Sequence, residues 1–221
     1  MNTLVISDTH LGKYDKEKDS FLKKLVEKYE RIIINGDFWD NWGGSFEELV
    51  NSGYKELLSL LKSKETIYIY GNHDYRAESQ KHLGEIFSDK QGIDFDINIG
   101  GKDFHFEHGH RFFHEQKKVR FRNYYYLIDK IPLLGPLVYK LMNFSYNLFP
   151  AKVTKNKMAT SRNDYVKSIK PREINYVMGH THIPEIDEKN KFFNTGCVMG
   201  KFFSYLVIDE QGNVNLVKKG L

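Results

Sequence analysis

Residues 31–40 read RIIINGDFWD, in which an apolar, β-branched run ends at a glycine and leads into two acidic residues. The run Ile32-Ile33-Ile34 is typical of a strand that is buried on both faces. We therefore expect a central strand of a helix-covered sheet, with Asp37 and Asp40 just beyond its end.

Four other segments follow the same plan, in which a short apolar run precedes residues that bind metal ions through oxygen or imidazole nitrogen. Strand ends on one edge of a sheet converge, and ligands bind in the crevice there. We therefore expect five motifs to meet in space. They are Asp8-Thr9-His10, Gly36-Asp37-Phe38-Trp39-Asp40, Gly71-Asn72-His73-Asp74, His108-Gly109-His110 and Gly179-His180-Thr181-His182.

The first third of the chain alternates between strand and helix patterns, which predicts a mostly parallel sheet covered by helices. Ser45 and Glu48 match a capping box at the start of the second helix. The expected order is strand 4–7, helix 17–30, strand 32–34, helix 45–61 and strand 66–70.

The later part of the chain has a different pattern. Period-two alternation around Gly100-Gly101 predicts an antiparallel hairpin of residues 94–99 and 103–107. Strand patterns return at 174–178, 204–209 and 214–218. We expect an α/β protein in which two sheets pack face to face with helices outside. Residues 1–221 form one domain, with a helical insertion at about 111–172.

Composition limits the class of protein. The single cysteine, Cys197, excludes an internal disulfide framework and a four-cysteine zinc site. The sequence shows no signal peptide pattern and no apolar stretch long enough for a transmembrane helix. We expect a cytoplasmic location, with peripheral contact at the inner face of the membrane through the insertion.

The motifs together supply more ligands than one ion needs. Mixed carboxylate, amide and imidazole groups suit Mn²⁺, Fe or Zn²⁺ and do not suit Ca²⁺. A single carboxylate can bridge two ions, as in two-metal hydrolases. We expect two divalent ions, with Mn²⁺ first among the candidates. The ligand set is Asp8, His10, Asp37, Asn72, His108, His180 and His182.

In order and spacing, the motifs resemble those of the calcineurin-like metallophosphoesterases, D-x-H, G-D-x-x-D, G-N-H-D/E, H and G-H-x-H. The resemblance implies a four-layer α-β-β-α sandwich and a phosphohydrolase that uses a metal-bridging hydroxide. It implies that Asp37 bridges the ions. The other ligands would be Asp8, His10 and His182 for one ion, and Asn72, His108 and His180 for the other.

Three residues near the ligands are candidates for catalysis. The resemblance gives His73 the role of general acid, and imidazole suits proton transfer near neutral pH. Asp74 is a candidate for orienting His73. Asp40 either orients a ligand histidine or is a turn residue near a helix start.

The insertion carries an unusual charge and composition. Residues 111–170 hold 13 Lys and Arg against 3 acidic residues, a net charge of +10, so the rest of the chain carries −6. Ten aromatic residues and an aliphatic run lie between Phe112 and Phe149. A basic, aromatic, amphipathic element is typical of contact with a membrane or acyl chains. The alternative is a solvated insertion without a partner. Candidate substrate-binding residues are Asn41, His110, Arg111, Lys117, Arg120 and Arg122.

The second motif and the insertion also resemble the family branch that contains UDP-2,3-diacylglucosamine diphosphatase. His73 and His110 differ from that branch, where many members carry Arg and Asp. We predict a phosphorylated substrate linked to a lipid or a nucleotide. The alternative is a phosphodiesterase or nuclease, but the aliphatic run Leu133–Leu148 argues against a nucleic-acid partner. The oligomeric state stays open.

Overall fold

The computed structural model describes residues 1–114, 134–149, 156–171 and 173–219. Its larger sheet has the strand order β10-β11-β1-β2-β3-β4, with β12 paired to β11. Strands β1 to β4 are parallel, and β11 runs antiparallel to β1. The bounds are β1 (Thr3–Ile6), β2 (Arg31–Asn35), β3 (Glu65–Ile69), β4 (Lys90–Gly92), β10 (Val198–Met199), β11 (Phe202–Ile208) and β12 (Val214–Lys219).

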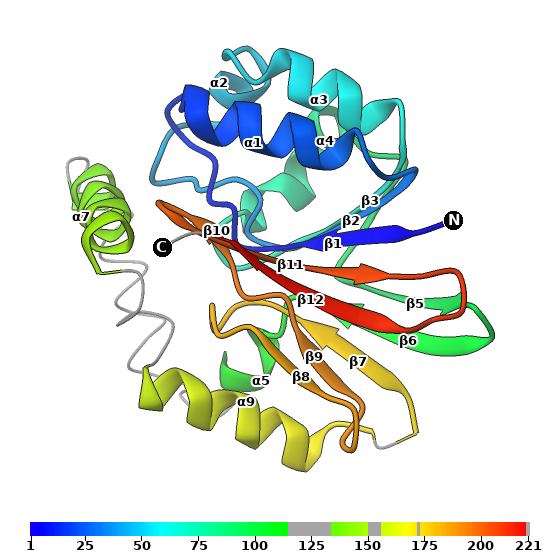
Figure 1. The fold of residues 1–221 in the computed structure, drawn as a ribbon. Coiled ribbons are helices and arrows are strands. Elements are labelled where there is room, and N and C mark those ends of the chain that lie inside the picture. The colour runs from blue at the N-terminus through cyan, green and yellow to red at the C-terminus, as the bar shows by residue number, and fades with distance from the viewer. Residues whose placement is uncertain (115–133, 150–155, 172, 220–221) are drawn as a thin grey trace.

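The second sheet has the order β5-β6-β7-β9-β8 and packs against the first (Figure 1). The hairpin of β5 and β6 confirms the expected turn at Gly100-Gly101. Its strands are β5 (Asp94–Ile99), β6 (Lys102–Glu107), β7 (Asn175–Met178), β8 (Glu185–Asp187) and β9 (Phe192–Asn194).

Side-chain alternation along the central strands separates two cores. Val5 and Ile33 face the second sheet and pack with Phe106 and Val177. Their neighbours in the chain, such as Ile32, face the helices on the other side. This two-sided burial is the physical reason for the continuous apolar runs in the sequence.

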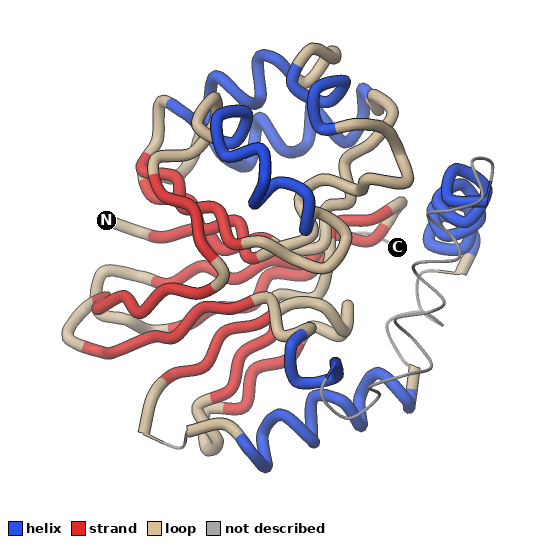
Figure 2. Tube along the Cα trace, turned by 180° about the vertical axis from the view of Figure 1, so that it is seen from behind, coloured by secondary structure: helices blue, strands red, loops and turns tan. Residues whose placement is uncertain are grey.

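Helices cover both outer faces, so the four-layer α-β-β-α sandwich is confirmed (Figure 2). One outer layer packs on the larger sheet, and α5 and α9 lie on the second sheet. Helix α7 stands at the side of the sandwich and packs on β10. The helices are α1 (Lys16–Val26), α2 (Phe46–Val50), α3 (Lys55–Lys62), the 3₁₀ helix η1 (Tyr75–Gln80), α4 (Lys81–Gly84), α5 (Arg111–His114), α7 (Leu134–Leu148) and α9 (Lys157–Ile169).

Several expected boundaries were wrong. Helix α1 ends at Val26, and the single helix expected over 45–61 is split into α2 and α3 by a turn. Gly53 lies in that turn, where any Cβ would collide with the Tyr14 ring. The capping box of Ser45 and Glu48 is present. The short strands β4, β8, β9 and β10 were not expected. Among the described helices, none has both the length and the apolar character needed to cross a bilayer.

Candidate metal centre

The loops that follow β1, β2, β3, β6 and β7 bring the candidate ligands to one edge of the sandwich. The described residues form overlapping groups that could each hold a metal ion. These are Asp8 with His10 and His182, Asp37 with His108 and His180, and Asp37 with His10 and His73. Both sheets therefore contribute to the site, and Asp37 belongs to two groups.

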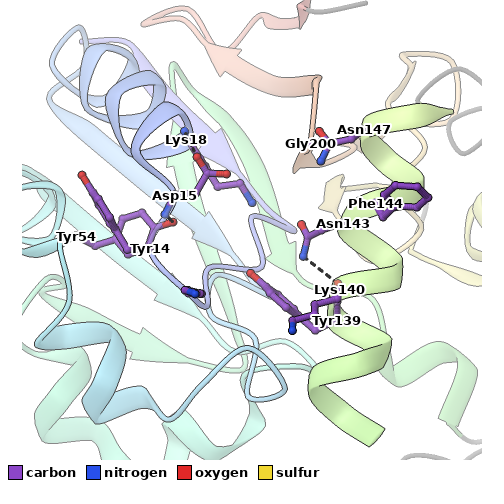
Figure 3. A pocket seen from close by; sticks show the side chains of 11 residues that line it. Tyr14, Asp15, Lys18, Tyr54, Tyr139, Lys140, Asn143, Phe144, Asn147 and Gly200 are labelled. Carbon is purple, nitrogen blue, oxygen red and sulfur yellow. Dashed lines mark hydrogen bonds between the residues drawn. The ribbon is translucent and has the colours of Figure 1, made fainter. Parts of the chain in front are cut away.

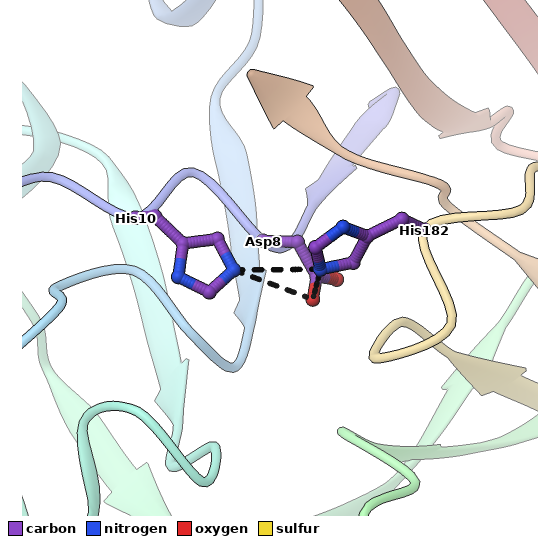
Figure 4. A group of neighbouring side chains, drawn as sticks. All are labelled: Asp8, His10 and His182. Carbon is purple, nitrogen blue, oxygen red and sulfur yellow. Dashed lines mark hydrogen bonds and ion pairs between the residues drawn. The ribbon is translucent and has the colours of Figure 1, made fainter. Parts of the chain in front are cut away.

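The ring nitrogens face the carboxylates directly. His182 Nε2 lies 3.0 Å from Asp8 Oδ1, and His108 Nε2 lies 3.1 Å from Asp37 Oδ2. His10 Nε2 lies between them, 3.8 Å from Asp37 Oδ2 and 3.9 Å from Asp8 Oδ1. Figure 4 shows the imidazoles of His10 and His182 converging on the Asp8 carboxylate. This convergence of nitrogen and oxygen donors suits divalent cations.

Residues outside the group hold the other nitrogen, Nδ1, of these histidines, and for His10 and His108 they come from β2 and the loop after it. His10 Nδ1 lies 3.0 Å from Asp40 Oδ2, and His108 Nδ1 lies 3.0 Å from the carbonyl oxygen of Asn35. When Nδ1–H donates to these acceptors, the Nε2 lone pair is directed toward the carboxylates. Such contacts set the tautomer and ring orientation of metal-binding histidines.

The backbone of the site is strained. Five candidate ligands have left-handed φ angles, a conformation that costs of order 1–3 kcal/mol for a non-glycine residue. Backbone hydrogen bonds hold these loops, including one of 2.9 Å from the His10 amide to the Asp37 carbonyl. Strain of this kind collects at functional sites. The residues are Asp8 (φ 51°), His10 (45°), Asp37 (50°), His180 (63°) and His182 (60°).

Glycine is required at two positions beside the ligands. Gly36 has a φ of 87°, and a Cβ there would collide with the His108 ring. A Cβ at Gly71 would collide with the Asp37 carboxylate. The glycines of the second and third motifs thus let the ligands approach one another closely.

Asn72 Oδ1 is a buried ligand atom with no hydrogen-bond partner among the described residues, and Asp8 Oδ1 and His108 Nε2 face only other candidate ligands, at His182 Nε2 and Asp37 Oδ2. A buried polar atom left unsatisfied costs about 1–3 kcal/mol. A divalent ion would satisfy such oxygen and nitrogen donors, so the residues present fit the metal centre that the motifs predict.

The buried charged groups of the centre shift one another's pKa values. Burial would raise the pKa of Asp37, but His108 and His73 hold it well below its usual range. Burial would lower the pKa of His108, but Asp37 and Asp8 raise it to about 10. Burial and the neighbouring His108 lower the pKa of His180, which keeps that imidazole neutral. Metal binding therefore competes with protons at this site.

Asp40 contacts a ligand histidine, as one of its two expected roles required, and Asp74 does not contact the histidine expected of it. Asp40 lies beside His73, with 3.1 Å between Oδ2 and Nδ1, and it also contacts His10. Asp74 instead accepts hydrogen bonds from the Phe38 amide at 2.8 Å, the Tyr68 hydroxyl at 2.7 Å and the Gly71 amide. The expectation that Asp74 orients His73 was wrong, because its carboxylate holds the backbone of the two loops.

The ionisation of these groups follows from burial and charge. Burial would lower the pKa of His73, but Asp37 and Asp40 raise it to about 9. Burial and the adjacent Asp37 raise the pKa of Asp74 to about 7. Burial would raise the pKa of Asp40, but His73 and His10 bring it below its usual range.

The expected substrate-binding residues are dispersed. His110 lies near the ligands, with ring centroids 5.5 Å from His108, and the Asn41 amide donates to the His73 carbonyl at 3.3 Å. The Arg111 guanidinium is engaged elsewhere, 2.8 Å from Asp94 Oδ2. Lys117, Arg120 and Arg122 lie outside the described residues.

Sequence reasoning missed contacts from helix α7 and from the residue before Asp8. The Tyr139 hydroxyl donates to the His10 carbonyl at 3.2 Å, and the Tyr146 hydroxyl hydrogen-bonds with His182 Nδ1. Ser7 Oγ donates to the Asp8 carboxylate. The seven-residue spacing of the two tyrosines, two turns of one helix face, was the available signal.

A cavity of about 410 Å³ lies between helix α7 and the start of helix α1. Figure 3 shows side chains of α7 on one side of it and Tyr14, Asp15 and Lys18 on the other. Its lining is polar and aromatic and includes Tyr139, whose hydroxyl contacts the His10 loop. The lining residues are Lys13, Tyr14, Asp15, Lys18, Tyr54, Tyr139, Lys140, Asn143, Phe144, Asn147 and Gly200.

The chain is similar to known proteins in sequence and in fold. A sequence model of the calcineurin-like phosphoesterases matches residues 1–208. No curated protein matches the chain. Among solved structures, the phosphoesterase YfcE from E. coli has a TM-score of 0.52 at 16% identity, with 98% of each chain covered. An archaeal phosphodiesterase has a TM-score of 0.48 at 16% identity, with 99% of each chain covered. The likeness to YfcE supports the fold.

Proposed function

Because the chain belongs to the calcineurin-like phosphoesterase family, whose members are dinuclear metal-dependent hydrolases, we propose that it hydrolyses a lipid-linked phosphoester or pyrophosphate. An acylated nucleotide sugar such as UDP-2,3-diacylglucosamine has this chemistry. Water would cleave the bond between its two phosphates, leaving one phosphate on the nucleoside and one on the acylated sugar.

The proposal assigns the metal-holding role to the converging side chains described above. Asp8, His10, Asp37 and His182 would hold one ion, and Asp37 would share a second with Asn72, His108 and His180. Two divalent ions, Mn²⁺ or alternatively Fe or Zn²⁺, would supply positive charge for the phosphoryl oxygens and an activated water.

His73 would protonate the leaving oxygen. Its Nδ1 is held by Asp40, so Nε2 is the nitrogen that would deliver the proton. Asp40 would keep the ring in this orientation, as it does for His10. General acid catalysis of this kind contributes about 10²–10⁴-fold to rate.

The exposed apolar face of helix α7 is the observation that supports a lipid-linked substrate. The opposite side of the helix contacts the metal centre through its tyrosines. Helix α7 contains no acidic residue. A large exposed apolar patch on a soluble protein marks an interaction site, and here it adjoins the centre. Its residues recur at helical spacing and are Leu137 (51% exposed), Leu141 (58%), Phe144 (60%) and Leu148 (52%).

The test compares three substrates in the presence of Mn²⁺, namely the diacylated nucleotide sugar, the same nucleotide sugar without acyl chains, and a nitrophenyl phosphodiester. Replacing Leu137, Leu141 and Phe144 together with Ser should lower kcat/KM for the acylated substrate at least about tenfold, because these side chains would no longer make apolar contacts with the bound acyl chains. Hydrolysis of the nitrophenyl diester should stay within about twofold.

Met158→Ser on α9 is the matched control, because Met158 is 61% exposed and lies on another helix. It should leave all three rates unchanged. Equal losses on all three substrates in the α7 variant would show that the apolar face serves folding. Preferred cleavage of oligonucleotides or cyclic nucleotides would assign the alternative, a nuclease or phosphodiesterase.

A further inference from the structure

Three ligand imidazoles of the centre have a partner at Nδ1, and these partners come from different parts of the molecule. His10 and His108 are held by Asp40 and by the Asn35 carbonyl, which belong to the loop after β2 and to β2 itself. His182 is held by Tyr146 of helix α7. One imidazole of the centre therefore depends on the insertion for its orientation.

The His182 ring has a defined direction. Its Nε2 faces the Asp8 carboxylate at 3.0 Å and His10 Nε2 at 3.4 Å, so Nε2 is the nitrogen available to an ion. With Nε2 as the ligand atom, Nδ1 carries the proton and donates to the Tyr146 oxygen. A rotated ring would move Nε2 away from Asp8.

The Tyr146 phenol is itself fixed. Its side chain is buried and packs with Cys197, Met199 and Phe202. The Cys197 thiol packs against Tyr146 and also interacts with its hydroxyl. A buried thiol is a weak acceptor, so the phenol oxygen stays available to the imidazole.

We propose that Tyr146 is a positioning residue that holds His182 with Nε2 toward Asp8, so that occupancy of the Asp8–His10–His182 group depends on the docking of helix α7. The Asp37–His108–His180 group has no described contact with α7 through its imidazoles and keeps its own partner at the Asn35 carbonyl. Loss of the Tyr146 hydroxyl would therefore weaken one of the two ions selectively.

The experiment rests on the metal centre of the proposed function and measures Mn²⁺ binding by titration calorimetry and by electron paramagnetic resonance of bound Mn²⁺. Tyr146→Phe keeps the ring and removes the hydroxyl. We expect one of two sites to weaken about 10–100-fold, the usual cost of losing an outer partner of a metal ligand. The signal of spin-coupled Mn²⁺ pairs should fall accordingly at limiting metal.

Tyr139→Phe is the matched control. Tyr139 lies on the same face of α7, but its hydroxyl contacts a backbone carbonyl. It should change both affinities by less than about threefold. An equal loss in the two variants would mean that the hydroxyls serve helix docking, and this outcome would overturn the positioning role.

A double-mutant cycle isolates the pair. In the His182→Gln background, Tyr146→Phe should cause no further loss of affinity, because the imidazole is gone. An undiminished loss there, or unchanged affinity in Tyr146→Phe alone, would overturn the inference while leaving the metal centre intact. Failure of the wild-type chain to bind Mn²⁺ at all would overturn the proposed function as well.

Discussion

At the scale of single residues, Asp37 lies in two of the groups that could hold an ion. Asp37→Asn removes negative charge from both. We expect the second bound Mn²⁺ to be lost and activity to fall by more than about 100-fold. Losing only a residue that hydrogen-bonds to a metal ligand already costs up to about 100-fold, and Asp37 is itself assigned as a ligand. Metal content after dialysis and turnover of a nitrophenyl diester check this. Asp96→Asn, at an exposed carboxylate paired with His105, is the control and should behave as wild type.

The general-acid role of His73 can be tested through the leaving group that it would protonate. If it protonates the leaving oxygen, His73→Ala should slow alkyl phosphoesters by about 10²–10⁴-fold. Nitrophenyl esters should slow much less, because nitrophenolate leaves without a proton. The groups that could hold an ion also include His73 with His10 and Asp37, so metal content must be measured in parallel. Loss of one ion together with equal loss of both activities would make His73 a ligand.

At the scale of elements, helix α1 buries an ammonium group against the loop after β1. Lys18 Nζ donates to the Thr9 carbonyl at 2.9 Å, and burial lowers the pKa of Lys18 to about 8. The unfolded chain binds this proton up to its ordinary pKa of 10.5. Between these values the unfolded state holds more protons, so the Lys18 contribution to stability rises with pH.

The prediction is that the free energy of unfolding of the metal-free protein increases between about pH 8 and about pH 10, after subtraction of a Lys18→Met variant measured in parallel. Urea unfolding at a series of pH values measures this difference. Lys24→Met, at an exposed position of α1, should follow the wild type. A difference curve that is flat, or that falls with pH, would show that the ammonium is not desolvated.

At the scale of the whole molecule, the centre joins loops from both sheets, so an ion bound there stabilises the packing of the sandwich. Mn²⁺ at about 100 times its Kd should add about 2.7 kcal/mol per site, which corresponds to roughly 5–10 °C in Tm for a chain of this size. Thermal unfolding with EDTA and with Mn²⁺ measures the shift. A shift of the same size in Asp37→Asn would place the stabilising ion elsewhere.

Much of the fold and of the candidate site is predictable from local sequence. The central strands are recognisable because burial on both faces demands continuous apolar runs, as in Ile32-Ile33-Ile34. The short strands β8 and β9 are not recognisable, because three residues carry too little periodicity. The predicted ligands Asp8, Asp37 and His182 converge because strand ends of a packed sandwich meet at one edge.

The sequence by itself determined the type of chemistry, since the motifs place carboxylate, amide and imidazole groups directly after strands. Only the tertiary structure decided which acid serves which histidine. Asp40 contacts His73 and His10. Asp74, which directly follows His73 in the sequence, accepts hydrogen bonds from backbone amides instead. It also decided that Tyr146 reaches His182. Such pairs lie far apart in the chain, so their contacts depend on how elements pack, which no local pattern encodes.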